Sequence, residues 1–334
     1  MKKILQYLFD YKTLSTAQSK DILIQISKGM YTETEITAFV TVFLMRTITI
    51  EELQGFSDAL LELCVKVDLG AEPLLDIVGT GGDGKNTFNI STLACFIAAG
   101  AGQKVAKHGN YGATSISGSS NVMEQLGYVF KADQDKLQKE LKEAGICFLH
   151  APSFHPALKT VGPLRKNLGI RTFFNMLGPL VNPARPQYQL LGVYNLEMAR
   201  LYNYLLQKSE RDFAIVHSLE GYDEISLTGD SKIITRAGER IATPESLGKR
   251  QVSAEDIFGG NTLEEAAGLF RRIITGKGSW AQNAVVLANA ATALHCTGNY
   301  ADYQQAYQQA VVSLESGKAL SALERLIDIN QAYK

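Results

Sequence analysis

The stretch from Asp76 to Gly127 restricts the fold most, because it holds two glycine-rich segments that each follow a short apolar run. In the first segment, the run DIV at 76–78 leads directly into GTGGDG at 79–84, which places four glycines in six positions. Glycine reaches positive φ without a Cβ clash, and consecutive free N–H groups in such a loop can bind an anion. The apolar run from 93 to 99 then predicts a helix, whose first N–H groups would point at the same anion.

This first loop does not match the two common phosphate motifs. No Gly-Lys-Ser/Thr follows at the Walker A spacing, and the glycines do not fit the dinucleotide pattern GxGxxG. Taken alone, a glycine-rich turn between a strand and a helix can also be a tight connection that binds no ligand.

The second segment repeats the arrangement after the next predicted strand. The run KVAK at 104–107 predicts that strand, HGNYG follows at 108–112, and residues rich in Ser, Thr and Gly precede a helix at 122–126. Lys107 supplies a positive charge and the hydroxyl groups supply donors, although a serine-rich loop can also be simply solvated. Two such loops after two neighbouring parallel strands favour a ligand with separated phosphate groups.

Helices and strands are distributed unevenly along the chain. From Lys2 to about Val67 only helices are predicted, and capping boxes begin at Ser15, Thr32 and Thr49. From Leu74 onward strands and helices alternate, which is typical of a mainly parallel sheet covered by helices. The predicted strands are 74–78, 104–107, 146–150, 188–193, 213–217 and 224–227, with a hairpin at 232–243. We therefore expect an α/β fold that binds its ligand beyond the carboxyl ends of the strands.

The composition restricts the partners and the compartment. The 334 residues carry a net charge of −1 with no long basic run, which argues against a nucleic-acid or membrane partner. The four cysteines form no CxxC pair, so they are expected to pack as small apolar residues in a reducing compartment. No apolar segment has signal-peptide or transmembrane character, and we expect a cytoplasmic protein.

Two adjacent carboxylates, Asp223 and Glu224, stand just after Gly221 and at the start of a predicted strand. Adjacent side chains of a strand point to opposite faces, so a loop geometry is needed for both to serve one site. Such a pair is often only a solvated turn. Beside a phosphate-binding cleft, however, it offers the hard oxygen ligands that Mg²⁺ prefers.

Four motifs, in this order, resemble those of the anthranilate phosphoribosyltransferase family: GTGGDGKNTFNIST at 79–92, KHGN at 107–110, RTFFNMLGPLVNP at 171–183 and GYDE at 221–224. The resemblance covers nearly the whole chain. It implies a small all-helical domain, 1–70 completed by about 156–182, and a larger α/β domain, 71–155 and 183–334, with a cleft between them. It also implies transfer of the phosphoribosyl group of 5-phosphoribosyl 1-diphosphate to the amine of anthranilate, an early step toward tryptophan. A homodimer formed through the helical domain is a further implication.

The resemblance implies roles for individual residues. Those expected to bind the phosphoribosyl diphosphate are Gly79, Gly82, Asp83, Thr87, Asn89, Ile90, Ser91, Thr92, Lys107, Ser115 and Ser119. Those expected to contact anthranilate are Gly79, His108, Asn110, Tyr111 and Arg165, with Arg165 facing its carboxylate. The implied ligands of a pair of Mg²⁺ ions are Ser91, Asp223 and Glu224. An aromatic amine needs no strong general base, and His108 is the nearest candidate for one.

The second loop departs from the family pattern. The family most often has Arg after KHGN, then a Ser-Ser pair, Lys and Asp, whereas this chain has Tyr111, Thr114-Ser115, Ile116 and Asn121. Two cationic groups are therefore missing, and main-chain and hydroxyl donors would have to replace their contacts. The Tyr111 ring is expected to pack against the aromatic acceptor.

Two other functions remain open from the sequence. A pyrimidine nucleoside phosphorylase shares the fold and a related glycine-rich loop, but the acid pair and the run NIST at 89–92 argue against it. A non-catalytic relative that binds nucleic acid would show basic patches and a degraded magnesium site. The net charge of −1 and the intact acid pair argue against that reading.

Overall fold

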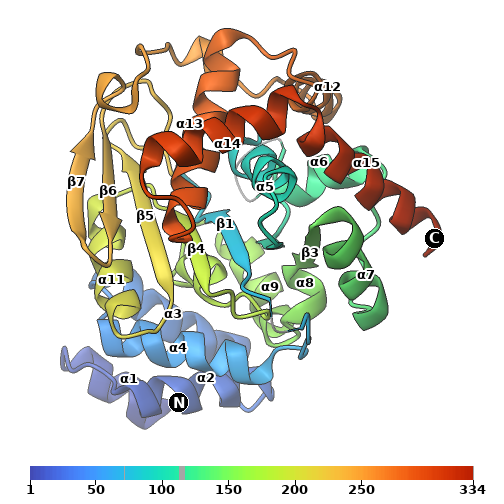
Figure 1. Cartoon of the computed structure of the whole chain (residues 1–334). Helices are drawn as coiled ribbons and strands as arrows, with labels where there is room; N and C mark the ends of the chain where they lie inside the picture. Colours follow the sequence, from blue (N-terminus) through green and yellow to red (C-terminus); the bar gives the residue numbers. More distant parts are fainter. Residues whose placement is uncertain (71, 113–116, 334) are drawn as a thin grey trace. The chain divides into compact units, whose positions relative to one another are not determined.

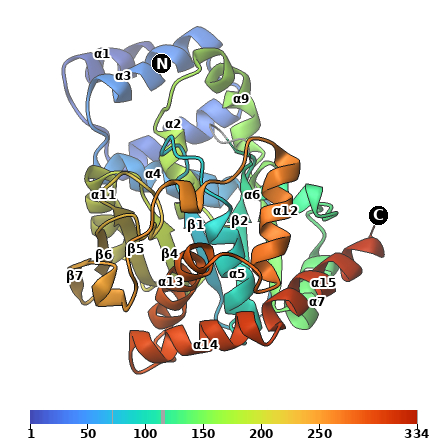
Figure 2. The same ribbon diagram turned by 90° about the horizontal axis from the view of Figure 1, so that it is seen from above.

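The computed structural model describes residues 1–70, 72–112 and 117–333, and the chain folds into two compact units. The first unit comprises 1–66 and 151–183, and the second comprises 67–150 and 184–334. Figures 1 and 2 show helices in the first unit and, in the second, a sheet with helices packed around it.

The first unit contains helices and no strand among its described residues. The three predicted capping boxes are confirmed, because Ser15, Thr32 and Thr49 each accept a hydrogen bond from the N–H three residues later. In its core, the rings of Phe56 and Phe173 stack with 4.5 Å between their centroids. Its helices are α1 (Lys2–Phe9), α2 (Thr16–Ser27), α3 (Glu33–Met45), α4 (Ile50–Leu63), α8 (Ala151–Phe154), α9 (Ala157–Leu168), α10 (Phe174–Leu177) and η1 (Gly178–Leu180).

The second unit is built on a seven-stranded sheet of order β3-β2-β1-β4-β5-β6-β7. The first five strands in this order are parallel, and β6 and β7 are antiparallel. The strands are β1 (Leu75–Gly79), β2 (Val105–Gly109), β3 (Ile146–His150), β4 (Tyr188–Gly192), β5 (Asp212–Ser218), β6 (Ser231–Thr235) and β7 (Gly238–Ala242). The helices are α5 (Ile90–Gly100), α6 (Ser119–Gln125), α7 (Gln134–Ala144), α11 (Leu196–Gln207), α12 (Leu263–Ile274), α13 (Trp280–Cys296), α14 (Tyr303–Glu315) and α15 (Lys318–Gln331), with short turns η2 (Glu245–Leu247) and η3 (Glu255–Ile257).

The predicted strand at 224–227 is wrong. These residues form an irregular segment between β5 and β6, and β6 takes the place beside β5 in the sheet. In this segment polar and apolar side chains alternate for a reason other than strand pairing. Ile225 and Leu227 are buried in the core, while Glu224 and Ser226 make hydrogen bonds within the unit. The predicted hairpin is confirmed as β6 and β7.

Helix α5 fixes the point where the first glycine loop ends. Nine of its 11 residues are buried. It packs against β1, α13, α14 and α15, which surround it in Figure 2. Close packing of this kind leaves little room for a helix to shift. The N-terminus of α5 at Ile90 is therefore a firm boundary for the loop that precedes it.

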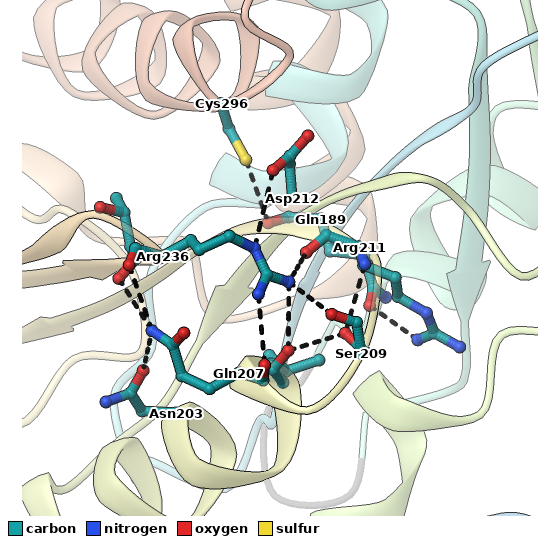
Figure 3. Close-up of polar contacts among 10 residues, drawn as sticks. Gln189, Asn203, Gln207, Ser209, Arg211, Asp212, Arg236 and Cys296 are labelled. Atoms are coloured by element: carbon teal, nitrogen blue, oxygen red, sulfur yellow. Dashed lines mark hydrogen bonds and ion pairs between the residues drawn. The ribbon is translucent and has the colours of Figure 1, made fainter.

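The turn between β6 and β7 is tied to the end of α11 by Arg236 (Figure 3). Its guanidinium donates hydrogen bonds to four main-chain carbonyls, those of residues 206, 207, 209 and 211, at 2.6–3.3 Å. The last carbonyls of a helix have no partner within the helix and carry its negative dipole end, so a cation suits them. Beside it, Arg211 donates to Gln189 of β4 at 3.0 Å. These bonds attach the antiparallel edge of the sheet to its parallel part.

Among the described residues, no helix is both long enough and apolar enough to cross a membrane. All four cysteines are free thiols, and three of them are buried. Burial raises the pKa of Cys95 to about 11, so this thiol stays protonated at neutral pH.

Candidate active site

The strand order reverses direction between β1 and β4. From β1 the chain continues through β2 and β3 on one side, and from β4 it continues through β5 on the other. In open α/β sheets, ligands bind beyond the carboxyl ends of the strands at such a switch point. Here β1 and β4 end side by side at Gly79 and Gly192, which are register partners. The loops that follow β1, β2 and β5 form the candidate site.

Gly79 and Gly192 lack a side chain because the segment that carries the acid pair passes directly over them. A Cβ on Gly192 would lie closer than 3.0 Å to the main-chain carbonyl of Asp223, and a Cβ on Gly79 would lie as close to its carboxylate. Real Cβ atoms essentially never approach other atoms so closely. The two glycines therefore allow Asp223 to reach the beginning of the first loop.

Asp223 and Glu224 both face the loop between β1 and α5. Asp223 Oδ2 accepts a hydrogen bond from the N–H of Gly81 at 2.7 Å, and Glu224 Oε1 accepts one from the N–H of Ser91 at 2.9 Å. Thr87 Oγ1 lies 3.5 Å from Glu224 Oε2. Neighbouring side chains of a regular strand could not converge in this way, whereas an irregular segment can bring them together.

Burial raises the pKa of three carboxyl groups in this region. Burial, together with the charge of Asp83, raises the pKa of Asp223 to about 7. Burial and repulsion from these two aspartates raise the pKa of Glu224 well above its ordinary value, and burial raises the pKa of Asp83. The charge of Lys107 opposes this by lowering the pKa of Glu224. A bound cation would relieve the repulsion and favour the ionised carboxylates.

These carboxylates offer oxygen ligands without forming a complete metal cage. Over the described ranges, no group of three or more His, Cys, Asp or Glu side chains is arranged to hold a metal ion. Mg²⁺ commonly binds through one or two carboxylates and completes its shell with water and substrate phosphates. The hydroxyl of Ser91 and the carboxylates of Asp223 and Glu224 fit such a partial shell.

The first glycine loop has the backbone that its composition predicts. Gly81, Gly82 and Gly84 have φ of 62°, 72° and 75°. Several buried side-chain oxygens in or beside this loop have no hydrogen-bond partner among the residues described; they are Thr80 Oγ1, Asn86 Oδ1, Asn89 Oδ1 and Thr92 Oγ1. Buried polar groups in folded proteins are nearly always paired. The two threonine hydroxyls near the N-terminus of α5 can donate to an anion, and the two amide oxygens can accept from hydroxyl groups of the same ligand.

The second loop is closed by Asn121 and joined to the first loop. Asn121 Oδ1 accepts hydrogen bonds from the N–H groups of Gly112 at 3.0 Å and Gly118 at 3.1 Å. Asn89 Nδ2 of the first loop donates to the carbonyl of Ser117 at 2.9 Å. Asn121, which stands where the family pattern has Asp, thus acts here as an acceptor that holds the two described ends of the loop together.

Tyr111 is anchored within its own unit. Its hydroxyl donates a hydrogen bond to Glu124 Oε1 at 2.7 Å, and its ring meets His150 edge-on with 4.8 Å between centroids. The Tyr111 side chain is still substantially exposed. Contact between its ring and anthranilate stays a prediction, and Glu124 and His150 would set the orientation of that ring.

The two predicted site residues at the end of β2 are buried. Lys107 donates from Nζ to the carbonyl of Ile77 at 2.7 Å, so its charge lies beneath the strand ends. His108 is part of β2 and is 2% exposed, which does not favour it as a solvent-accessible base. At the start of α6, Ser119 Oγ donates to the carbonyl of Asn110 at 3.3 Å.

Three predicted site residues remain: Ile90, Arg165 and Ser115. Ile90 is fully buried, so only its main chain could face a ligand. Arg165 belongs to the helical unit, on α9, where its guanidinium lies over the Phe174 ring at 5.7 Å and burial lowers its pKa. Ser115 lies outside the described residues, as do Thr114 and Ile116.

Three contributors to the site were not identified from the sequence. Gly192 is required by the path of Asp223, Asn121 closes the second loop, and Asn289 of α13 binds the main chain beside Glu224. Asn121 was visible only as a departure from the family pattern, and Asn289 as the one amide in the run VVLANAATAL at 285–294, where Thr292 is the only other polar side chain. A buried amide in such a helix needs partners, but the sequence does not say which.

Two family models match the chain. The helical bundle domain of a glycosyl transferase family matches residues 2–64. The a/b domain of the same family matches residues 71–320. Together they cover most of both compact units.

Individual relatives agree with these models. The chain is 57% identical over 330 residues to anthranilate phosphoribosyltransferase of Flavobacterium johnsoniae, covering 99% of this chain and 100% of the relative. The crystal structure of the Thermus thermophilus enzyme of that name superposes with a TM-score of 0.92 at 32% identity, covering 98% of this chain and 99% of that one. A Saccharomyces cerevisiae enzyme of that name, solved in complex with PRPP and Mg, gives 0.88 at 30% identity, covering 96% and 94%. The chain therefore belongs to the glycosyl transferase family defined by these two domains and, within it, to the anthranilate phosphoribosyltransferases.

Proposed function

We propose that this protein transfers the phosphoribosyl group of 5-phosphoribosyl 1-diphosphate to the amine of anthranilate, releasing diphosphate in tryptophan biosynthesis. The observation that carries the proposal is the convergence of the acid pair on the first glycine loop at the β1/β4 switch point. A donor with a diphosphate needs anion-binding N–H groups and a means of neutralising the leaving group in one place. The names of the relatives supply the identity of the donor and the acceptor.

The first loop and the start of α5 would hold the donor. Main-chain N–H groups and the hydroxyls of Thr80 and Thr92 can donate to diphosphate, and the amide oxygens of Asn86 and Asn89 can accept from the ribose hydroxyls. The residues assigned to the donor are Gly79, Gly82, Asp83, Thr87, Asn89, Ile90, Ser91, Thr92, Lys107, Ser115 and Ser119. Lys107 would act through its buried charge because its Nζ already bonds to a main-chain carbonyl.

The cofactor that fits this site is Mg²⁺, with two ions per subunit as proposed from the family resemblance. Ser91, Asp223 and Glu224 would hold it, and the raised pKa values of the two carboxyl groups support a site that favours a positive charge. When bound, Mg²⁺ neutralises the negative charge that develops on departing diphosphate. The yeast enzyme's structure with PRPP and Mg supports the choice of metal.

The chain's own residues contribute position and electrostatics. The reacting ribose carbon becomes oxocarbenium-like as diphosphate departs, so the two substrates must be held in line. An aromatic amine is nucleophilic when neutral, and no general base is assigned. We infer that His108 contacts the acceptor or supports β2, since its side chain is buried. Gly79, Asn110, Tyr111 and Arg165 are the other proposed contacts with anthranilate.

The Arg165→Ala variant is expected to weaken anthranilate binding by roughly tenfold or more, because one charge-assisted hydrogen bond is worth about 1.5–3 kcal/mol. Steady-state kinetics should show the loss in the Michaelis constant for anthranilate and a much smaller change for the donor. Lys159→Ala, an exposed change on the same helix, serves as the control. Equal weakening of both substrates would contradict the assignment of Arg165 to the acceptor.

We infer a homodimer formed through the helical unit. Large apolar side chains are exposed there, and Phe9, Tyr11 and Met45 are 61%, 86% and 83% exposed. Exposed apolar side chains of this size are typical of an interface.

The double variant Phe9→Glu/Met45→Glu should sediment as a monomer at micromolar concentration, whereas the wild type sediments as a dimer. Placing a charge within an apolar interface costs more than a single contact supplies. Val312→Glu, a similarly exposed position in α14 of the other unit, should leave the dimer intact. A monomeric wild type would refute the inference.

One assay tests the function. Loss of anthranilate fluorescence should require both the diphosphate donor and Mg²⁺. A pyrimidine nucleoside phosphorylase would instead consume a nucleoside and phosphate, and a non-catalytic relative would consume neither. A cytoplasmic location is part of the proposal, and so is the absence of a nucleic-acid or membrane partner.

A further inference from the structure

We propose that Asn289 of α13 is a positioning residue for the acid pair, because it orients the peptide group that follows Glu224. The inference rests on the proposed function, in which Glu224 holds Mg²⁺. Asn289 touches neither the glycine loop nor the carboxylates in the hydrogen bonds described here, and it acts on the backbone that carries them.

The amide of Asn289 pairs with Ile225 as a neighbouring strand would. Oδ1 accepts from the Ile225 N–H at 3.0 Å, and Nδ2 donates to the Ile225 carbonyl at 2.9 Å. The second Nδ2 hydrogen bonds to the carbonyl of Val285, one helical turn earlier, at 2.9 Å. Asn289 is 2% exposed, so all these bonds form away from solvent. This pairing explains why Ile225 can be buried outside the sheet with its main chain satisfied.

The peptide between Glu224 and Ile225 is held from two sides. Its N–H goes to Asn289, and its carbonyl, that of Glu224, accepts from Ser218 Oγ at 2.6 Å. Ser218 is fully buried at the end of β5 and also accepts from the N–H of Ser226 at 3.1 Å. These two bonds fix the backbone from which the Glu224 side chain projects.

Helix α13 is a suitable support for such a contact. It begins with a capping box at Ser279, and 13 of its 17 residues are buried. Two residues after Ile225, Leu227 has a φ of 57°, which a leucine rarely adopts. Its carbonyl accepts from the N–H of Val252 at 3.0 Å. The segment after the acid pair is therefore an unfavourable chain path that depends on anchors, and Asn289 and Ser218 are the two side chains that hold the peptide next to Glu224.

The chain contains a matched control. Asn330 of α15 is fully buried and makes the same pair of bonds to Val129: Oδ1 accepts from its N–H and Nδ2 donates to its carbonyl, both at 2.9 Å. Val129 lies in the α6–α7 connection, far along the chain from the acid pair. Replacing either asparagine removes a pair of bonds to the N–H and the carbonyl of one residue. Asn289→Ala also loses the bond to Val285, and in Asn330→Ala the Val129 carbonyl keeps a bond from Lys136 Nζ at 3.1 Å. Only one of the two supports Glu224.

The test compares wild type, Asn289→Ala and Asn330→Ala in two titrations with Mg²⁺. The first follows turnover, and the second follows the rise of the melting temperature in the presence of inorganic diphosphate, which needs no catalysis. Both variants should melt below the wild type without ligand. In both titrations, the Mg²⁺ concentration for a half-maximal response should be at least roughly tenfold higher for Asn289→Ala. Residues that orient metal ligands change the affinity for the metal by about 10–100-fold. Asn330→Ala should match the wild type.

Several results would overturn the inference. One is a folded Asn289→Ala protein with wild-type Mg²⁺ dependence, and another is an equal shift in Asn330→Ala. If Asn289→Ala does not fold, Asn289→Ser, which keeps a buried hydroxyl, takes its place with the same expected shift. A wild type that shows no Mg²⁺-dependent turnover would refute the proposed function instead, and the melting titration would still decide the role of Asn289.

Discussion

The double variant Asp223→Asn/Glu224→Gln is expected to lose Mg²⁺-dependent turnover by about a thousandfold or more while keeping its fold. The amides have the same shape and can still accept from the N–H groups of Gly81 and Ser91. What they lack is the negative charge that, in the proposed function, binds the metal. Removing a single preorganised group that stabilises transition-state charge already costs about 100–1,000-fold.

The stability of this variant provides an internal check on the same assignment. A carboxyl whose pKa is raised by folding destabilises the metal-free protein progressively as pH rises from its unfolded value to its folded value. For Asp223 this window runs from 3.8 to about 7. Without metal, the double variant should therefore melt at or above the wild-type temperature at pH 8, with a smaller difference at pH 5. Turnover that persists at saturating Mg²⁺ would refute the metal assignment.

The Gly192→Ala variant is expected to lose at least as much activity as the Asp223→Asn/Glu224→Gln variant and also to lose stability. Its new methyl group would overlap the main-chain carbonyl of Asp223, and main chain cannot move aside as the end of a flexible side chain can. The segment from 219 to 230 would have to move as a whole, taking Glu224 with it. We expect no detectable turnover and a lower melting temperature by differential scanning calorimetry.

Two other glycine substitutions separate these effects. A methyl group on Gly79 meets only the Asp223 carboxylate, so Gly79→Ala should lower the affinity for Mg²⁺ with a smaller loss of stability. Gly268 in the middle of α12 has open space around it, and Gly268→Ala should stabilise the protein by about 0.5–1 kcal/mol. A Gly192→Ala protein with normal turnover would contradict the described path of the acid segment.

Local sequence signals predicted the loop and the helices around the site. The glycine loop that follows β1, the helix behind it and the capping boxes of the helical unit each depend on residues a few positions apart. The order of the motifs then identified the family. Such features could be read from one sequence because their causes lie within one turn or one loop.

The contacts that shape the site could not be predicted in the same way. The segment at 224–227 has the polarity of a strand, and only the bonds to Asn289 and Ser218 show why it is not one. Many strands end in a glycine, so the sequence gives no reason to single out Gly192. The reason appears in the structure, where Asp223, which comes much later in the chain, passes over Gly192. The pairings with Asn289 and with Gly192 join positions far apart in the chain, and no local pattern encodes them.

The carboxylates of Asp223 and Glu224 accept from two N–H groups of the loop that would receive the donor. They would therefore compete with the diphosphate for these N–H groups. A cation that drew the carboxylates away would make the N–H groups available to the substrate, so the two binding events would assist each other. Thermodynamic linkage makes this assistance reciprocal: the donor must tighten the metal by the same factor as the metal tightens the donor.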